Sequence, residues 1–278
     1  VLAELLLYQK HRRHLQPLTV EIVKHIEFVS RRPNKYDHRR ALSFLCRLTC
    51  NNGDICETLL KCKAPCEVHT LVLGMMKHSR YPPLLASGAG AISNMCLHSP
   101  QFRLLFGREG VKCARRTITY SGRPAAEDAQ RDRVAHGVNA LASLTINSPS
   151  NRSAVVDEAA EKVVLSAMRK CSGPDAVMDA GCLLMFNLLC NRHRQPDETV
   201  ILEPFGVVRL RAIAIFNAGG RRIIEDAKEA VAEVPDDLSD TEKDRWKRIE
   251  ENVKPSIENL NDDRIKELEG IRWWSFFR

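Results

Sequence analysis

The chain has 278 residues, of which 44% are hydrophobic, and it carries 42 basic and 35 acidic side chains. No apolar run approaches the roughly 20 residues that a membrane-spanning helix needs. The ten cysteines lie mostly inside apolar helical patterns, which favours a reduced intracellular protein over a secreted one. We therefore expect a cytoplasmic protein, or a mitochondrial one if a presequence stood before Val1.

Residues 1–36 have the pattern of an incomplete helical repeat. Val1–Lys10 and Leu18–Ser30 each place apolar side chains at helical spacing. We interpret 1–36 as a partial N-terminal repeat that precedes a complete array.

Residues 37–220 repeat one pattern four times, at intervals of 44 to 49 residues. The four copies align on Arg47, Asn94, Ser143 and Asn187, and six positions before each stands a tiny residue: Ala41, Gly88, Gly137 and Gly181. Such self-similarity is typical of stacked helical repeats, none of which can bury its apolar face alone. Each copy is predicted to hold one long helix and two shorter ones. In the second copy, Gly110 is expected to separate the two shorter helices. The predicted helices span residues 37–50, 54–61 and 66–78; 83–97, 101–106 and 111–120; 132–146, 151–156 and 161–170; 175–190, 198–202 and 207–216.

Residues 221–278 are interpreted as a tail. An amphipathic segment at 221–234 is predicted to be a helix that caps the last repeat, and Ser239 with Glu242 reads as a capping box that opens a charged helix. The chain closes on four large aromatic side chains: Trp273, Trp274, Phe276 and Phe277.

The three-helix unit and its tiny residue resemble armadillo repeats, and Ile92-Ser93-Asn94-Met95 and Met185-Phe186-Asn187-Leu188 carry the resemblance best. HEAT repeats share the helix pair and have a similar length. The resemblance covers residues 37–217. It implies an all-α, right-handed α-solenoid of about four to five repeats, with a helical C-terminal tail and a concave groove lined by the long helices.

In armadillo proteins, groove asparagines hydrogen-bond the backbone of an extended partner peptide. The resemblance places that role on Asn94 and Asn187, while Arg47 and Ser143 occupy the same position in the other repeats, and Asn139 lies one turn before Ser143. Each amide can donate and accept, which suits peptide-backbone recognition. The alternative is that Asn94 and Asn187 bind a carbonyl of the neighbouring repeat.

Importin-type arrays show a tryptophan one turn before the asparagine. This chain has Ser43, Gly90, Asn139 and Leu183 there. The binding of nuclear-import cargo is therefore not expected.

Neither a metal site nor a catalytic site is predicted. Five cysteines fall within residues 46–66, but their spacing along helices suits buried thiols better than the converging loops of structural zinc. No phosphate-binding loop, metalloprotease motif or nucleophile elbow is present, so we predict a protein that is not an enzyme and takes no cofactor.

Charge is uneven along the chain. Residues 1–220 hold 30 basic and 19 acidic side chains, while residues 221–278 hold 12 basic and 16 acidic ones. A basic array suggests an acidic partner, or a tail that folds back on its own repeats. RNA is a further candidate partner, although the chain lacks a regular column of stacking side chains.

These features together predict a scaffold for other protein subunits or for an extended peptide. The aromatic terminus is interpreted as an anchor in another subunit, because four exposed aromatics exceed what a monomer normally tolerates. Folding of the terminus back on the solenoid is the alternative. A second hypothesis is an accessory structural subunit of a large organellar complex, either respiratory or ribonucleoprotein.

Overall fold

The fold is known from a computed structural model. It describes residues 18–62, 67–120, 127–170, 176–190, 192–194, 200–203 and 205–220, with the single positions 222, 223, 225, 226, 247 and 251. The chain divides into two compact units, Val1–Ala154 and Val155–Arg278. Each unit is considered by itself.

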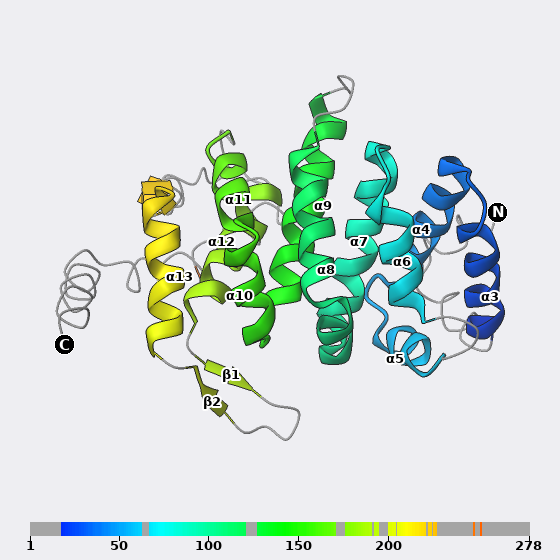
Figure 1. The fold of residues 1–278 in the computed structure, drawn as a ribbon, viewed down its shortest axis with the longest axis horizontal. Helices are drawn as coiled ribbons and strands as arrows, with labels where there is room; N and C mark the ends of the chain where they lie inside the picture. Colours follow the sequence, from blue (N-terminus) through cyan, green and yellow to red (C-terminus); the bar gives the residue numbers. More distant parts are fainter. Residues whose placement is uncertain are drawn as a thin grey trace. The chain divides into compact units, whose positions relative to one another are not determined.

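The first unit contains helices that follow one another in chain order (Figure 1). Their bounds are α3 (Thr19–Ser30), α4 (Lys35–Thr49), α5 (Gly53–Lys61), α6 (Val68–Lys77), α7 (Pro82–His98), α8 (Pro100–Thr119), α9 (Glu127–Thr145) and α10 (Pro149–Asp157), the last of which begins in this unit and ends just past the boundary at Ala154. The predicted repeat of one long and two shorter helices is confirmed here, with α4, α7 and α9 as the long helices. Of these, α9 begins five residues earlier than its pattern indicated.

Asparagines and prolines set the helix ends. The Asn34 side chain accepts a hydrogen bond from the Tyr36 amide, and Asn52 accepts one from the Ile55 amide, so both act as N-caps. Asn51 and Asn147, which follow α4 and α9, have φ angles of 51° and 47°. Asparagine tolerates this left-handed backbone, which is why helices often end there.

The tiny residue of each long helix lets the helix before it approach closely. A Cβ atom added at Gly88 would lie 2.4 Å from the Met76 sulfur of α6. At Gly137 the added atom would lie 2.6 Å from Ile118 Cγ1 and 3.1 Å from the Ala114 carbonyl oxygen of α8. The repeat therefore conserves a contact between two helices, and the glycine provides the space for it.

One break between helices lies three residues earlier than predicted. Gly107, with φ 44° and ψ −142°, kinks α8 into two helical segments. Gly110, the residue expected to separate them, continues the second segment and is buried. Its added Cβ would meet Phe106 at 2.8 Å and Leu144 of α9 at 3.4 Å, so Gly110 serves close packing rather than the turn.

The second unit contains α11 (Ala160–Met168), α12 (Ala176–Leu189) and α13 (Phe205–Asn217). Gly181 of α12 repeats the tight contact of Gly88, because a Cβ there would lie 2.5 Å from the Met168 sulfur of α11. The helix predicted at 198–202 is wrong. Instead, β1 (Arg192–Arg194) and β2 (Val200–Leu202) form an antiparallel pair in which Arg192 faces Leu202.

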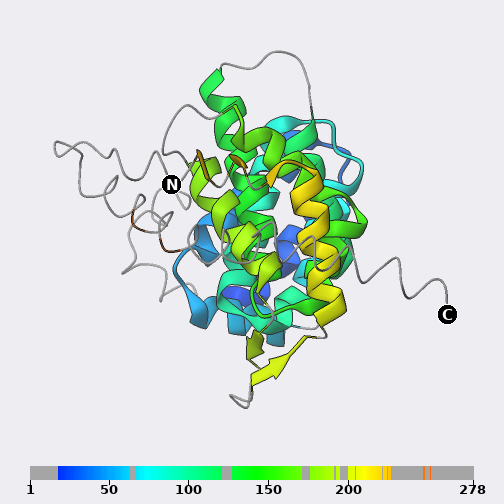
Figure 2. The same cartoon turned by 90° about the vertical axis from the view of Figure 1, so that its left-hand side faces the viewer.

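The hairpin connects α12 to α13 and lies beyond the first turn of α13 in both views (Figures 1 and 2). Pro196 interrupts a helical pattern, and the β-branched pair Val200-Ile201 favours an extended backbone over a helix. Where β2 ends, the Glu203 carboxylate pairs with the Arg211 guanidinium of α13, and both side chains are buried.

Several predictions fall outside the described residues. These are the helix at 1–10, nearly all of the capping and charged helices, and the aromatic terminus. The predicted divisions at residues 36 and 220 stay predictions, since the two compact units divide the array between residues 154 and 155.

Candidate functional site

The long helices α4, α7 and α9 lie side by side in the first unit, and we group the residues around their aligned repeat positions as one candidate face. We call it the α4–α7–α9 face. The residues that define it are the accessible Ser43, Arg47, Ser93, Asn94, His136 and Asn139, together with the buried Gly90 of α7. Arg47 and His136 are exposed, and the four polar Ser and Asn residues are half-buried.

Asn94 is bound to the neighbouring repeat. Its Nδ2 donates a hydrogen bond of 2.7 Å to the carbonyl oxygen of Cys46 in α4. The alternative given above for Asn94, a hydrogen bond to a carbonyl of the neighbouring repeat, therefore describes part of its role. The same Nδ2 also donates to Cys46 Sγ at 3.7 Å, so the Oδ1 acceptor of the half-buried amide is the atom that retains capacity for a partner.

Ser143 makes the corresponding link between α7 and α9. Its Oγ lies 3.0 Å from Ser93 Oγ, and Ser93 directly precedes Asn94 just as Cys46 precedes Arg47. In two successive repeats, therefore, the aligned residue contacts the residue that lies just before the aligned residue of the preceding repeat. Ser143 itself is buried, which leaves little of it for a partner.

Gly90 of α7 and Asn139 of α9 are the remaining small and amide positions of the face. Gly90 is buried, and a Cβ there would lie 2.7 Å from Cys46 Sγ and 3.4 Å from His136 Nδ1. A tryptophan at this position would displace both neighbours. Asn139 is half-buried, and its side chain makes no hydrogen bond within the described part of the chain.

The remaining predicted contact residues lie elsewhere. Asn187 belongs to α12 of the second unit and is only 7% exposed. Trp273, Trp274, Phe276 and Phe277 lie outside the described residues. The structure therefore brings together Arg47, Asn94, Asn139 and Ser143 of the predicted set.

Buried arginines cap the ends of helices in this fold, and the apolar repeat pattern did not indicate them. Arg103 donates hydrogen bonds to the carbonyl oxygens of Cys96 at 2.7 Å and Ile146 at 3.0 Å, at the ends of α7 and α9. Arg152 repeats the arrangement with a bond of 3.2 Å to Thr145. The guanidinium groups supply the donors that the last carbonyls of a helix lack.

A signal for these arginines exists in the sequence. Arg103 and Arg152 stand 49 residues apart, the same interval as Asn94 and Ser143. Arg116, Arg133 and Arg169 also donate to backbone carbonyls. Part of the positive charge of residues 1–220 is therefore occupied within the fold, which reduces the share left for an acidic partner or for RNA.

The described cysteines carry free thiols. Burial raises the pKa of Cys56 and of Cys182 to about 12, and that of Cys113 to about 11. Such thiols stay protonated at neutral pH and are poor nucleophiles and ligands. Within the described ranges no cluster of three metal-ligating side chains occurs, and no helix is long and apolar enough to cross a membrane.

Comparison with known proteins identifies the fold. The crystal structure of an engineered protein superposes with a TM-score of 0.64 and 13% identity, covering 92% of this chain and 88% of that one. A designed armadillo repeat protein superposes with a TM-score of 0.60 and 11% identity, over 94% of this chain and 98% of that one. A second designed armadillo repeat protein, in complex with the peptide (KR)4, superposes with a TM-score of 0.57, 11% identity and the same coverage.

No family profile matches the sequence, and no curated protein matches it. At such low identity the superpositions establish the fold. The chain is an armadillo-like α-solenoid, as the repeat pattern predicted, with a local departure at the hairpin β1–β2.

Proposed function

We propose that the protein is a non-catalytic scaffold that binds an extended segment of another protein along the α4–α7–α9 face. The observation that carries this proposal is the set of half-buried polar side chains on three neighbouring helices. Among the described residues Asn139 has no hydrogen-bond partner, and Asn94 is only partly engaged. An extended peptide needs donors and acceptors for its backbone, and these amides offer both.

The peptide complex of a designed armadillo protein supports the idea that this fold can hold an extended chain. The chemistry of that peptide does not transfer. Arg47 and His136 are exposed on the present face, and Gly90 replaces the aromatic platform on which a basic side chain would lie. We therefore propose a neutral or acidic segment as the partner.

Site-specific photo-crosslinking tests the proposal. A benzoylphenylalanine placed at Ser43 or Asn139 should crosslink the partner, whereas one at the exposed Lys112 of α8 serves as the matched control. Binding of the identified segment should then weaken in Arg47→Glu. Crosslinks obtained from Lys112 alone, or an affinity unchanged by Arg47→Glu, would contradict the use of this face.

Docking through the aromatic terminus is a separate part of the proposal, supported by composition alone. Deleting residues 272–278 should release the protein from an assembly and leave its helicity and melting temperature unchanged. A lower melting temperature of the isolated protein would indicate that the aromatics cover their own solenoid.

The compartment is also a proposal. Free, buried thiols with raised pKa values suit a reducing environment. An accessory role in a large organellar complex is consistent with a scaffold, and purification of the endogenous protein with its partners would test it.

A further inference from the structure

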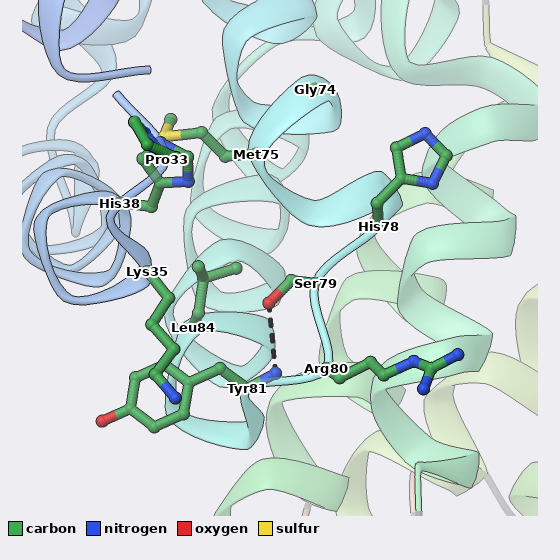
Figure 3. A pocket seen from close by; sticks show the side chains of 10 residues that line it. All are labelled: Pro33, Lys35, His38, Gly74, Met75, His78, Ser79, Arg80, Tyr81 and Leu84. Carbon is green, nitrogen blue, oxygen red and sulfur yellow. Dashed lines mark hydrogen bonds between the residues drawn. The ribbon is translucent and has the colours of Figure 1, made fainter. Parts of the chain in front are cut away.

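A cavity of about 360 Å³ lies in the first unit, away from the α4–α7–α9 face. It is a partly open pocket lined by the start of α4, the end of α6 and the segment that leads into α7 (Figure 3). Its volume is at the lower end of the range of small-ligand pockets. The lining residues are Pro33, Lys35, His38, Gly74, Met75, His78, Ser79, Arg80, Tyr81 and Leu84.

The lining is cationic and contains no carboxylate. Lys35 and Arg80 are its basic side chains, and neither makes an ion pair within the described residues. Lys35 Nζ instead lies 5.3 Å from the ring centroids of both Tyr36 and Tyr81. His78 and Arg80 are exposed and extend outward at the mouth of the cavity (Figure 3).

Two carboxylates, one on α4 and one on α8, a helix that packs on α6, are already engaged. Asp37 of α4 accepts a hydrogen bond from Asn34 and lies 3.9 Å from Arg40. Glu109 of α8 pairs with Lys112 at 2.6 Å. Neither carboxylate lines the cavity, so they do not neutralise its lining.

Polar groups with unused capacity complete the site. The Nε2 atom of His38 is buried without a hydrogen-bond partner. Ser79 Oγ accepts from the Tyr81 amide at 3.2 Å, and its own hydroxyl hydrogen is left for another acceptor.

The segment that carries Ser79 is held in place by a further cation. Arg116 donates hydrogen bonds to the carbonyl oxygens of Met76 and Lys77, and to that of Ser79 at 2.5 Å. The loop is thus fixed before any ligand arrives, which lowers the entropy cost of binding.

An apolar wall faces these groups. Met75 and Leu84 are buried, and Figure 3 shows Met75 beside Pro33 and Leu84 between Lys35 and Ser79. A cation and an apolar wall in one small cavity suit a negatively charged group attached to an apolar body.

We propose that this pocket binds a single oxyanion, carboxylate or phosphoryl, carried on an apolar side chain or ring. Lys35 supplies the charge at the cavity and Arg80 adds positive charge at its mouth, His38 and Ser79 supply hydrogen-bonding atoms, and Met75 and Leu84 hold the apolar body. This site does not depend on the proposed function of the α4–α7–α9 face.

Titrations of the whole protein, followed by the backbone amide resonances of Gly74 and Tyr81, test the proposal. The probes are acetyl-leucine, its uncharged counterpart acetyl-leucinamide, phenyl phosphate and inorganic phosphate, all at constant ionic strength. Acetyl-leucine or phenyl phosphate should shift both resonances saturably, and acetyl-leucinamide should not. Tighter binding of one acid than the other identifies the oxyanion as carboxylate or phosphoryl.

Variants separate this site from general surface charge. Lys35→Ala with Arg80→Ala should weaken binding of the better acid by about tenfold or more, because both cations are lost. Arg39→Ala, on the same helix and outside the cavity, is the matched control and should leave the affinity unchanged. Equal binding of acetyl-leucinamide, absence of saturable shifts, or equal weakening by Arg39→Ala would each overturn the proposal.

Discussion

The two units solve the same connection in different ways. In the first unit, the segment of α8 before Gly107 leads from the long helix α7 to the third helix of the repeat, while in the second unit a hairpin leads from the long helix α12 to the third helix α13. Glycine lies against methionine in both units, at Gly88 and Met76 and again at Gly181 and Met168. The packing of a long helix on its predecessor is therefore what repeats, and the connecting element is free to change.

The polar groups that fix the connections differ as well. In the first unit, Arg103 binds neutral carbonyl oxygens at the ends of two helices. In the second unit, Arg211 is paired with the Glu203 carboxylate. An arginine that caps helix ends is stabilised by several carbonyl dipoles. In a buried ion pair, each charge is instead stabilised mainly by the opposite charge, so loss of one partner leaves the other uncompensated.

We expect the largest effect from breaking that ion pair. Glu203→Gln removes one charge and leaves the Arg211 guanidinium buried without its counter-charge, which should cost about 3–5 kcal/mol of unfolding free energy. Denaturant unfolding followed by circular dichroism measures the change. Asp226→Asn, which alters an exposed carboxylate of the same unit, is the control, and equal stability of the two variants would contradict the pairing.

A somewhat smaller loss is expected at Arg103. Arg103→Met keeps much of the volume but leaves the carbonyls of Cys96 and Ile146 without this donor, at a cost of about 2–3 kcal/mol. Hydrogen exchange of the amides in the last turns of α7 and α9 should accelerate at the same time. Arg39→Met, on the exposed side of α4, should change neither quantity, and a similar loss there would exclude the capping role.

The helices could be predicted from the sequence, whereas the hairpin β1–β2 and the position of the break within α8 could not. Apolar periodicity and the tiny residues were sufficient for the helices from α3 to α12, because those signals act within one helix or between neighbours. The segment at 198–202 was predicted as a helix from repeat position alone, although Val200 and Ile201 favour a strand. At α8, Gly107 and Gly110 are equally suited to a break by composition, and packing against Leu144 decides between them.

The glycines of the repeat provide an intermediate effect. An alanine at Gly137 would meet the backbone oxygen of Ala114, which cannot move without distorting α8, so Gly137→Ala should lose about 2 kcal/mol. Gly88→Ala meets only the flexible Met76 side chain, and the gain in helix propensity of about 1 kcal/mol opposes the clash. Thermal unfolding should therefore separate the two variants, and an equal loss would show that methionine is as rigid as backbone here.

The candidate site was predictable only in part. Repeat position placed Arg47, Asn94, Asn139 and Ser143 on one face, since these residues share a helix register. The sequence could not show which of them the neighbouring helix uses, because that depends on the distance between α4, α7 and α9. The cavity beside Lys35 had no sequence signal, since its lining comes from three separate segments that carry no shared motif.

The smallest effect separates the two asparagines of the α4–α7–α9 face. Asn94→Ala removes the hydrogen bond to the Cys46 carbonyl and should lower the unfolding free energy by about 1 kcal/mol. Asn139→Ala removes no bond within the described structure and should leave stability unchanged. If both amides contact a partner segment, both variants should bind it more weakly by a similar factor. If Asn94→Ala lowers stability but not affinity, Asn94 serves only the link between repeats. If the affinity of Asn139→Ala is also unchanged, neither asparagine belongs to the proposed site.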